Sequence, residues 1–165
     1  CIWSVSGGAL HETGDAVTDE CSVLLPLTAV DVLVETRAAY TQFTSTGVRN
    51  LWSGARASRG TSNLNAYTCS GRMPNPSTST IQAFTLVEGG PNPSISSQPV
   101  PAIIEGEAHT ITTTVVGSAI RCTWDGAIST GGTDTRYAGA GSGIVVGTLR
   151  GKARFEHLLV YQLGP

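Results

Sequence analysis

The sequence predicts an all-β protein, a two-sheet antiparallel β-sandwich that forms a single domain over residues 1–165. Three observations lead to this prediction. Short runs of alternating apolar and polar residues follow one another at close spacing, which is typical of sandwich strands. The chain holds 20 glycines and abundant threonine and serine, which suit strands joined by many turns. No run has helical periodicity, and the residues that favour helices are scarce, with one methionine and only Lys152 as a lysine.

The expected strands end where glycine, proline or clustered polar residues interrupt the alternation. The clearest alternation covers residues 30–40, where Val32, Val34 and Tyr40 share one face and Glu35 lies on the other. The other expected strands are residues 1–5, 9–13, 22–27, 48–53, 65–70, 80–88, 102–104, two runs between His109 and Gly126, 143–149 and 153–162. The segments expected to be loops are residues 55–64, 71–79, 89–101 and 129–142.

Two dipeptides after His109 mark tight turns. Two β-rich runs meet at Gly117-Ser118, and the second run ends at Asp125-Gly126. Glycine and aspartate adopt positive φ at low cost, so both dipeptides suit two-residue hairpin turns.

The charge pattern argues against a nucleic-acid partner. The formal net charge is −2, only 13% of residues are charged, and the basic residues are scattered singly. A nucleic-acid surface needs clustered lysine and arginine. No run approaches the roughly 18 apolar residues of a transmembrane helix. The chain opens on a β pattern, so we expect neither a transmembrane segment nor a signal peptide.

The four cysteines are Cys1, Cys21, Cys69 and Cys122, and no pair has the C-x-x-C spacing of zinc and redox motifs. Their even number favours two disulfides and an oxidising compartment, and three pairings are compatible with the sequence. We favour Cys1–Cys21 and Cys69–Cys122, because Cys69 and Cys122 both lie on strand faces expected to point inward. The alternatives are four buried free thiols or, for Cys1, the lipid-modified cysteine of a bacterial lipoprotein, which would leave Cys21 unpaired.

Four phrases of the sequence, in their order, resemble the concanavalin A-like (laminin G-like) jelly-roll domains of secreted bacterial proteins. They are Trp3-Ser-Val-Ser-Gly-Gly-Ala-Leu10, Tyr67-Thr-Cys69, the hairpin from His109 to Gly126 and the closing strand from Ala153 to Val160. The resemblance spans nearly the whole chain and implies that the sandwich is a jelly roll. Sugar-binding modules, adhesion modules and glycoside hydrolases share this fold, so the resemblance alone does not choose among these functions.

The chain lacks the Glu-x-Asp-x-x-Glu strand that glycosidases of this fold use to place their catalytic carboxylates. The nearest pattern is Glu105-Gly-Glu107, with His109 two residues further on. In an extended chain these three would share a face and could form an acid–base or metal cluster, but we prefer an exposed turn before a strand. No Gly-x-Ser-x-Gly elbow occurs, and His157 shares a face with Phe155, which predicts a core histidine. We therefore expect no enzyme.

A carbohydrate site needs an aromatic platform for the C–H face of a sugar and polar side chains for its hydroxyls. The aromatic residues that could stay exposed are Trp52, Tyr137, Tyr40 and Tyr67, whereas we assign Trp3 and Trp124 to the core. The predicted ligand-binding group is Trp52, Arg49, Asn50, Tyr67 and Arg72. The alternative interpretation is that these aromatic residues also belong to the core.

The function that follows is a secreted or cell-surface binding module without catalytic activity, and its favoured partner is a glycan. An extracellular protein is the alternative partner, including further copies of the chain in a homo-oligomer or assembly, and a glycoside hydrolase is the least favoured function. No cofactor is expected except a structural calcium ion, which laminin G-like modules often bind. Its candidate ligands are Asp15, Asp19 and Glu20 in one early loop.

Overall fold

The computed structural model describes residues 1–14, 20–28, 30–60, 64–75, 77–87, 92–138 and 143–164. The regular elements in these ranges are β-strands, which confirms the predicted class. In chain order they are β1 (Trp3–Ser6), β2 (Ala9–Glu12), β3 (Glu20–Pro26), β4 (Val32–Phe43), β5 (Arg49–Arg59), β6 (Leu64–Asn75), β7 (Thr78–Leu86), β8 (Ser94–Val100), β9 (His109–Val116), β10 (Ala119–Trp124), β11 (Ile128–Thr133), β12 (Gly143–Leu149) and β13 (Gly151–Gln162). Over the same ranges, no helix has the length and apolar character needed to cross a membrane.

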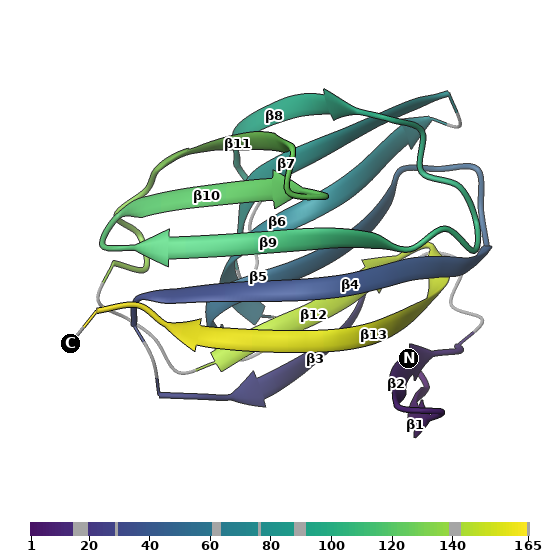
Figure 1. The fold of residues 1–165 in the computed structure, drawn as a ribbon, viewed down its shortest axis with the longest axis horizontal. Helices are drawn as coiled ribbons and strands as arrows, with labels where there is room; N and C mark the ends of the chain where they lie inside the picture. The colour runs from purple at the N-terminus through teal and green to yellow at the C-terminus, as the bar shows by residue number, and fades with distance from the viewer. Residues whose placement is uncertain are drawn as a thin grey trace.

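Two antiparallel sheets pack face to face, as predicted (Figure 1). Within the described residues, the sheet nearer the viewer has seven strands in the order β1-β2-β13-β4-β9-β10-β11. The sheet behind it has six strands in the order β3-β12-β5-β6-β7-β8. The last two strands of the chain, β12 and β13, each enter a different sheet between strands from the N-terminal half. The C-terminal residues are therefore needed to complete both layers.

The core lies between the two sheets, and β4 shows how the sequence produces it. Val32, Val34 and Tyr40 are completely buried in the main core cluster, whereas Arg37 is exposed. One face of the strand is thus buried and the other is more exposed to solvent, which confirms the alternation predicted for residues 30–40. Burial of apolar surface contributes roughly 25 cal/mol per Å² and provides the main driving force for this packing.

The last strand, β13, departs from its predicted alternation. A β-bulge between Phe155 and His157 shifts its register against β4. Phe155 is buried in the core, but His157 lies opposite Arg37, and its Nε2 is 3.3 Å from Oε1 of Glu35 at the surface. The prediction of a core histidine at position 157 is wrong, because the bulge moves this side chain to the other face of the sheet.

The four segments expected to be loops all contain strand. β5 continues to Arg59, β6 continues to Asn75, and β11 occupies the start of 129–142. The proline-rich segment 89–101 contains β8, which tolerates Pro99 because it is an edge strand, where half of the backbone groups need no partner in the sheet. Residues 102–104, expected to form an edge strand, do not form one.

One predicted hairpin turn is confirmed and the other is longer than predicted. Val116 pairs with Ala119, so Gly117-Ser118 is a two-residue turn, and Gly117 has a φ of 54°. Trp124 pairs with Ile128, which leaves three residues in the second turn. Asp125 and Gly126 of that turn both have positive φ, at 49° and 70°. The sequence therefore located the reversal correctly, but not its length.

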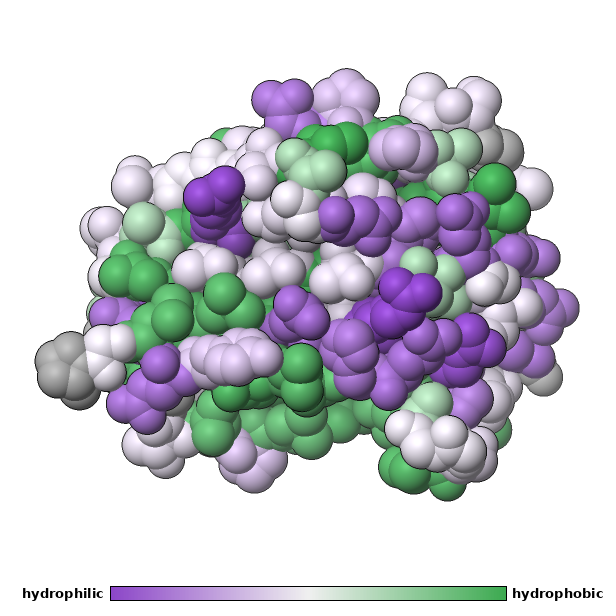
Figure 2. Space-filling model, in the orientation of Figure 1, coloured by the Kyte–Doolittle hydropathy of each residue, from purple (hydrophilic) through white to green (hydrophobic). Residues whose placement is uncertain are grey.

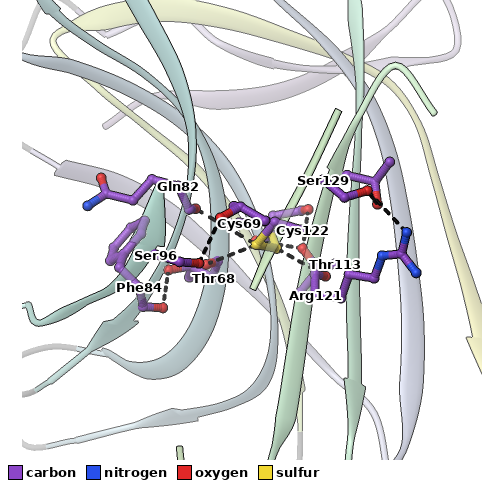
Figure 3. Close-up of a disulfide and its surroundings, with 12 residues drawn as sticks. Thr68, Cys69, Gln82, Phe84, Ser96, Thr113, Arg121, Cys122 and Ser129 are labelled. Carbon is purple, nitrogen blue, oxygen red and sulfur yellow. Dashed lines mark hydrogen bonds between the residues drawn. A yellow bond between two sulfur atoms is a disulfide. The ribbon is translucent and has the colours of Figure 1, made fainter. Parts of the chain in front are cut away.

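Both favoured disulfides are present. Cys69 of β6 bonds to Cys122 of β10, with a Cα–Cα distance of 5.3 Å, and both residues are fully buried (Figure 3). Because β6 and β10 belong to different sheets, this bond joins the two layers through the core. Cys1 bonds to Cys21 at a Cα–Cα distance of 5.4 Å and holds the first residues of the chain against β3.

Arg56 connects the two sheets at one end of the sandwich. It lies at a β-bulge of β5 with a φ of 50°, and its side chain has no exposed area. Its guanidinium donates to the backbone carbonyls of Val30 (2.9 Å), Gly117 (2.6 Å) and Tyr137 (3.3 Å). It also donates to the carboxylate of Asp31 at 2.9 Å. One buried cation thus satisfies acceptors from three separate segments, which would otherwise be costly to desolvate.

Replacing both cysteines of the inter-sheet bond, as C69A/C122A, is expected to lower the free energy of unfolding by about 4 kcal/mol. The bond closes a loop with a sequence separation of 53, against 20 for Cys1–Cys21. The chain-entropy relation gives about 4 kcal/mol for the longer loop and about 3 kcal/mol for the shorter. Urea unfolding of C69A/C122A and of the matched pair C1S/C21S checks this order. Equal losses in the two variants would contradict it.

The substitution Arg56→Met retains much of the apolar stem but removes every donor, so several carbonyls lose their partner in the protein. We expect a loss of about 3–5 kcal/mol in the free energy of unfolding. The matched control is Arg37→Met, because Arg37 pairs with Glu156 at the surface, where both side chains are at least 32% exposed. That variant should lose less than about 1 kcal/mol. Similar urea midpoints for the two variants would contradict the structural role of Arg56.

Candidate functional site

The candidate site lies on the outer face of the six-stranded sheet, which points away from the core. Leu51, Cys69 and Ile81 face the core from three adjacent strands. Their neighbours in the sequence therefore face outward, because successive side chains of a strand point to opposite sides. The strand register places these outward residues side by side: Asn50 is opposite Arg72.

A hollow of about 300 Å³ opens on this outer face. Its described lining is polar except for one ring, and it comes from four strands or their ends: Asn50, Arg72, Gln82, Phe84, Asn92 and Ser94. We call this feature the sheet hollow. The buried Phe84 supplies an apolar surface, and the surrounding side chains offer amide, hydroxyl and guanidinium groups.

Two amide side chains of the sheet hollow are held in place by hydrogen bonds. Gln82 Nε2 donates to the Ser94 hydroxyl at 2.8 Å, which fixes the amide between β7 and β8. Asn92 Oδ1 accepts from the backbone N–H of Val87 at 3.0 Å. Each bond uses one end of the amide and leaves the opposite end, a carbonyl in Gln82 and an NH₂ group in Asn92, for a bound molecule.

Arg72 and Asn50 have unused hydrogen-bonding capacity. Among the described residues, no hydrogen bond or ion pair is found for the half-buried Arg72 guanidinium, although it carries five N–H donors. Asn50 Oδ1 is buried and has no hydrogen-bond partner within the described structure. Buried polar atoms in folded proteins are usually paired, so unpaired ones beside a hollow are candidates for contact with a ligand or water.

The structure brings together two of the five residues predicted to bind a ligand, Asn50 and Arg72. Trp52 shares their face of β5 but is only 2% exposed, so it cannot serve as an open aromatic platform. Its ring lies against β12, where a Cβ at Gly147 would come within 2.6 Å of it. The expectation of an exposed Trp52 is therefore wrong, and the glycine that makes room for the indole comes from a distant part of the chain.

Tyr67 and Arg49 lie on the inner side of the sheet, away from the hollow. Tyr67 is completely buried, and its hydroxyl donates to the Asp134 carbonyl at 2.8 Å. Arg49 is also buried; its Nε donates to the Ser45 carbonyl at 2.8 Å, and its guanidinium stacks on Phe43. Both are structural residues, so their assignment to the ligand site is corrected. The other aromatic candidates are likewise unavailable, because Tyr40 is buried and Tyr137 is half-buried against Tyr67.

Four lining residues were not predicted from the sequence: Gln82, Phe84, Asn92 and Ser94. For β7 a signal existed, because Gln82 interrupts an apolar run between Ile81 and Ala83 and so had to face outward. For Asn92 and Ser94 there was none, since both lie in the proline-rich segment that was expected to be a loop.

The conceivable cluster of Glu105, Glu107 and His109 does not form. Glu105 accepts a hydrogen bond from the backbone N–H of Phe43 at the end of β4. His109 is buried, its Nδ1 lies 2.8 Å from a carboxylate oxygen of Asp125, and its ring stacks on Trp124. The preferred interpretation, an exposed turn before a strand, is confirmed, because Glu105 and Glu107 are exposed in and after a turn that precedes β9.

The expected calcium ligands cannot be compared with the structure as a group. Asp15 and Asp19 lie outside the described residues. Glu20, at the start of β3, accepts a hydrogen bond from the Ser22 hydroxyl at 3.3 Å. Its burial raises the pKa of the carboxyl, while the bond from Ser22 acts in the opposite direction. In the part of the chain that is described, no three His, Cys, Asp or Glu side chains gather as a metal-ligand set.

In sequence, no family model matches the chain and no curated protein is similar to it. In structure, the likeness to several solved proteins spans almost the whole chain. The carbohydrate-binding module CBM66 from Bacillus subtilis has a TM-score of 0.74 and 13% identity, covering 98% of this chain and 91% of that one. The exoplasmic/lumenal domain of VIP36, bound to Ca²⁺ and Man3GlcNAc, has a TM-score of 0.66 and 11% identity, covering 99% and 82%.

A third similar structure is an enzyme. The β-glucanase of Bacillus licheniformis has a TM-score of 0.63 and 12% identity, covering 98% of this chain and 82% of that one. At such low identity these likenesses establish a shared fold, and binding proteins and enzymes both have it. Its two sheets and its likeness to these proteins show that the chain has the concanavalin A-like jelly-roll fold, as the order of its sequence phrases predicted.

Proposed function

We propose that this protein is a non-catalytic carbohydrate-binding module that holds a glycan in the sheet hollow. The observation that carries the proposal is the lining of the hollow, in which fixed amides and a guanidinium surround the Phe84 ring. Sugars present hydroxyls and C–H groups together, so a site with several oriented polar groups around a small apolar surface suits them. Similar structures that are described as a carbohydrate-binding module and as a sugar-bound domain support the same conclusion.

The chemistry of the lining favours binding over hydrolysis. Glycoside hydrolysis commonly needs two carboxyl groups on either side of the scissile bond, about 5–10 Å apart. The described lining of the sheet hollow contains no aspartate or glutamate. Glu105, the nearest match to a catalytic motif, accepts a backbone hydrogen bond elsewhere in the fold. A module that binds sugar without cleaving it is therefore the better fit to this surface.

An extracellular or cell-surface location goes with this function. Two disulfides join cysteine pairs of the chain, and such bonds persist in oxidising compartments. The glycans of cell walls, matrices and cell surfaces are met in those compartments.

A second candidate function, an assembly module, rests on apolar side chains at the edges of the sheets. β2 pairs only with the first part of β13, so in the described structure residues 157–162 form an open edge. Leu159, Val160 and Tyr161 are exposed there, and Leu25 and Leu27 are exposed at the end of β3. Figure 2 shows apolar side chains gathered over this lower left part of the molecule. Open edges and apolar patches favour association of chains.

The substitution Gln82→Ala is expected to weaken glycan binding roughly tenfold, because it removes a hydrogen-bonding group that is already fixed in position. Gln98→Ala is the matched control, since Gln98 lies exposed on the neighbouring strand β8, opposite the inward-facing Ile81. A glycan array followed by calorimetry on the best ligand measures the effect. Absence of binding to any glycan, or equal losses in the two variants, would overturn the proposal.

The same array in EDTA tests the proposed structural calcium. Loss of binding or a lower melting temperature in EDTA, restored by added calcium, would support an ion held with Asp15, Asp19 and Glu20. Unchanged binding and melting would reject it.

For the assembly candidate, we expect sedimentation velocity to show a dimer or larger species at micromolar concentration, and Val160→Lys to dissociate it. A monomer at every concentration tested would reject this second function.

A further inference from the structure

We propose that the sheet hollow selects acidic glycans, and that the anionic group of the sugar pairs with Arg72. This inference rests on the proposed function and adds the chemical class of the ligand. It follows from the positive charge of Arg72 and from the hydrogen bonds that its guanidinium lacks within the described residues.

Arg72 differs from most other arginines of the protein. Among the described residues, Arg37, Arg56, Arg136 and Arg154 form ion pairs, and Arg49, Arg121 and Arg150 donate hydrogen bonds. Arg59 also has no such partner in the part of the chain that is described, but it is exposed at the end of β5. Within the described structure, Arg72 is the one arginine that combines an unpartnered guanidinium with a half-buried place in the wall of a hollow.

No carboxylate balances this charge within the described lining of the hollow. The other lining groups are amides, a hydroxyl and an aromatic ring. In the free protein, water can solvate the guanidinium through the open mouth of the hollow. A ligand that fills the hollow displaces that water, and a neutral ligand returns hydrogen bonds but no opposite charge. An anionic ligand returns both, often as a bidentate pair. The desolvation cost therefore acts against neutral ligands and favours acidic ones.

The remaining lining groups point to a sugar rather than to a simple anion. Gln82 and Asn92 are each fixed at one end, so their free ends are ready to meet hydroxyls. Asn50 Oδ1, opposite Arg72 in the register, is an acceptor without a partner among the described residues, and a hydroxyl can donate to it. A small inorganic anion would use Arg72 but leave these groups unpaired.

Because the protein as a whole is not basic, a preference for acidic glycans can be traced to one site by mutation. The formal net charge is −2 and the basic residues are dispersed, so no general attraction for polyanions is expected. Preference for an acidic sugar should therefore depend on one arginine and not on many.

The test is a glycan array that carries uronate, sialate and sulfate glycans beside neutral counterparts, probed with the native protein, Arg72→Gln and Arg121→Gln. Arg121 is the matched control, because it is an exposed arginine on β10 of the opposite sheet. The best acidic ligand is then compared by calorimetry with its methyl ester or desulfated form, which tells a carboxylate from a sulfate. Melting temperatures show that each variant is folded.

The expected result is at least a tenfold preference for the acidic form, lost in Arg72→Gln, partly retained in Arg72→Lys and unchanged in Arg121→Gln. Binding of neutral glycans alone, with Arg72→Gln unaffected, would overturn the inference and leave the proposed function standing. Acidic binding that survives Arg72→Gln would also overturn it, because the anion would then lie elsewhere. Absence of binding to every glycan would overturn both.

Discussion

The covalent bond between Cys69 and Cys122 fixes how the two sheets of this protein lie on each other. It crosses the core between β6 and β10, and therefore requires both cysteines to point inward. Since successive side chains of a strand alternate, an inward Cys69 places Ser70 and Arg72 together on the opposite, outward face of β6. A shift of one residue in β6 would carry the arginine into the apolar core. The bond thus stabilises the sandwich and also keeps Arg72 on the outer face of the six-stranded sheet.

The sheet hollow arises from the same alternation acting on neighbouring strands. On β5, β6 and β7, the side chains of Asn50, Arg72 and Gln82 face away from the main core, and the register places them close together. β8 and the residue Asn92 before it add further polar groups at the margin. A rigid sheet holds side chains more firmly than a loop does, so a ligand meets groups that are already oriented. This is the physical basis for assigning recognition to this face.

The fold was predictable because half-buried strands carry their pattern locally, as Val32 to Tyr40 show. The same reasoning favoured the pairing of Cys69 with Cys122. The site was only partly predictable. Tyr67 lies two residues before Cys69 and so shares its inward face, which the sequence already implied. The burial of Trp52, in contrast, depends on Gly147 in a strand that is distant along the chain. The contribution of Ser94 depends on an edge position that lets a proline-containing segment pair as a strand. Long-range contacts of this kind leave no local sequence pattern.

The buried guanidinium of Arg56 has a consequence for how the chain reaches its native state. Its partners lie 26, 61 and 81 residues away along the chain. Contacts between such distant residues require large loops to close first, which is slow. Loop closure costs conformational entropy, and the contacts offset this cost only when the strands are already in place. The cluster around Arg56 can therefore be complete only late in folding. Interactions that form after the transition state act mainly on the rate of unfolding, so we expect Arg56 to affect the lifetime of the folded protein more than the rate at which it folds.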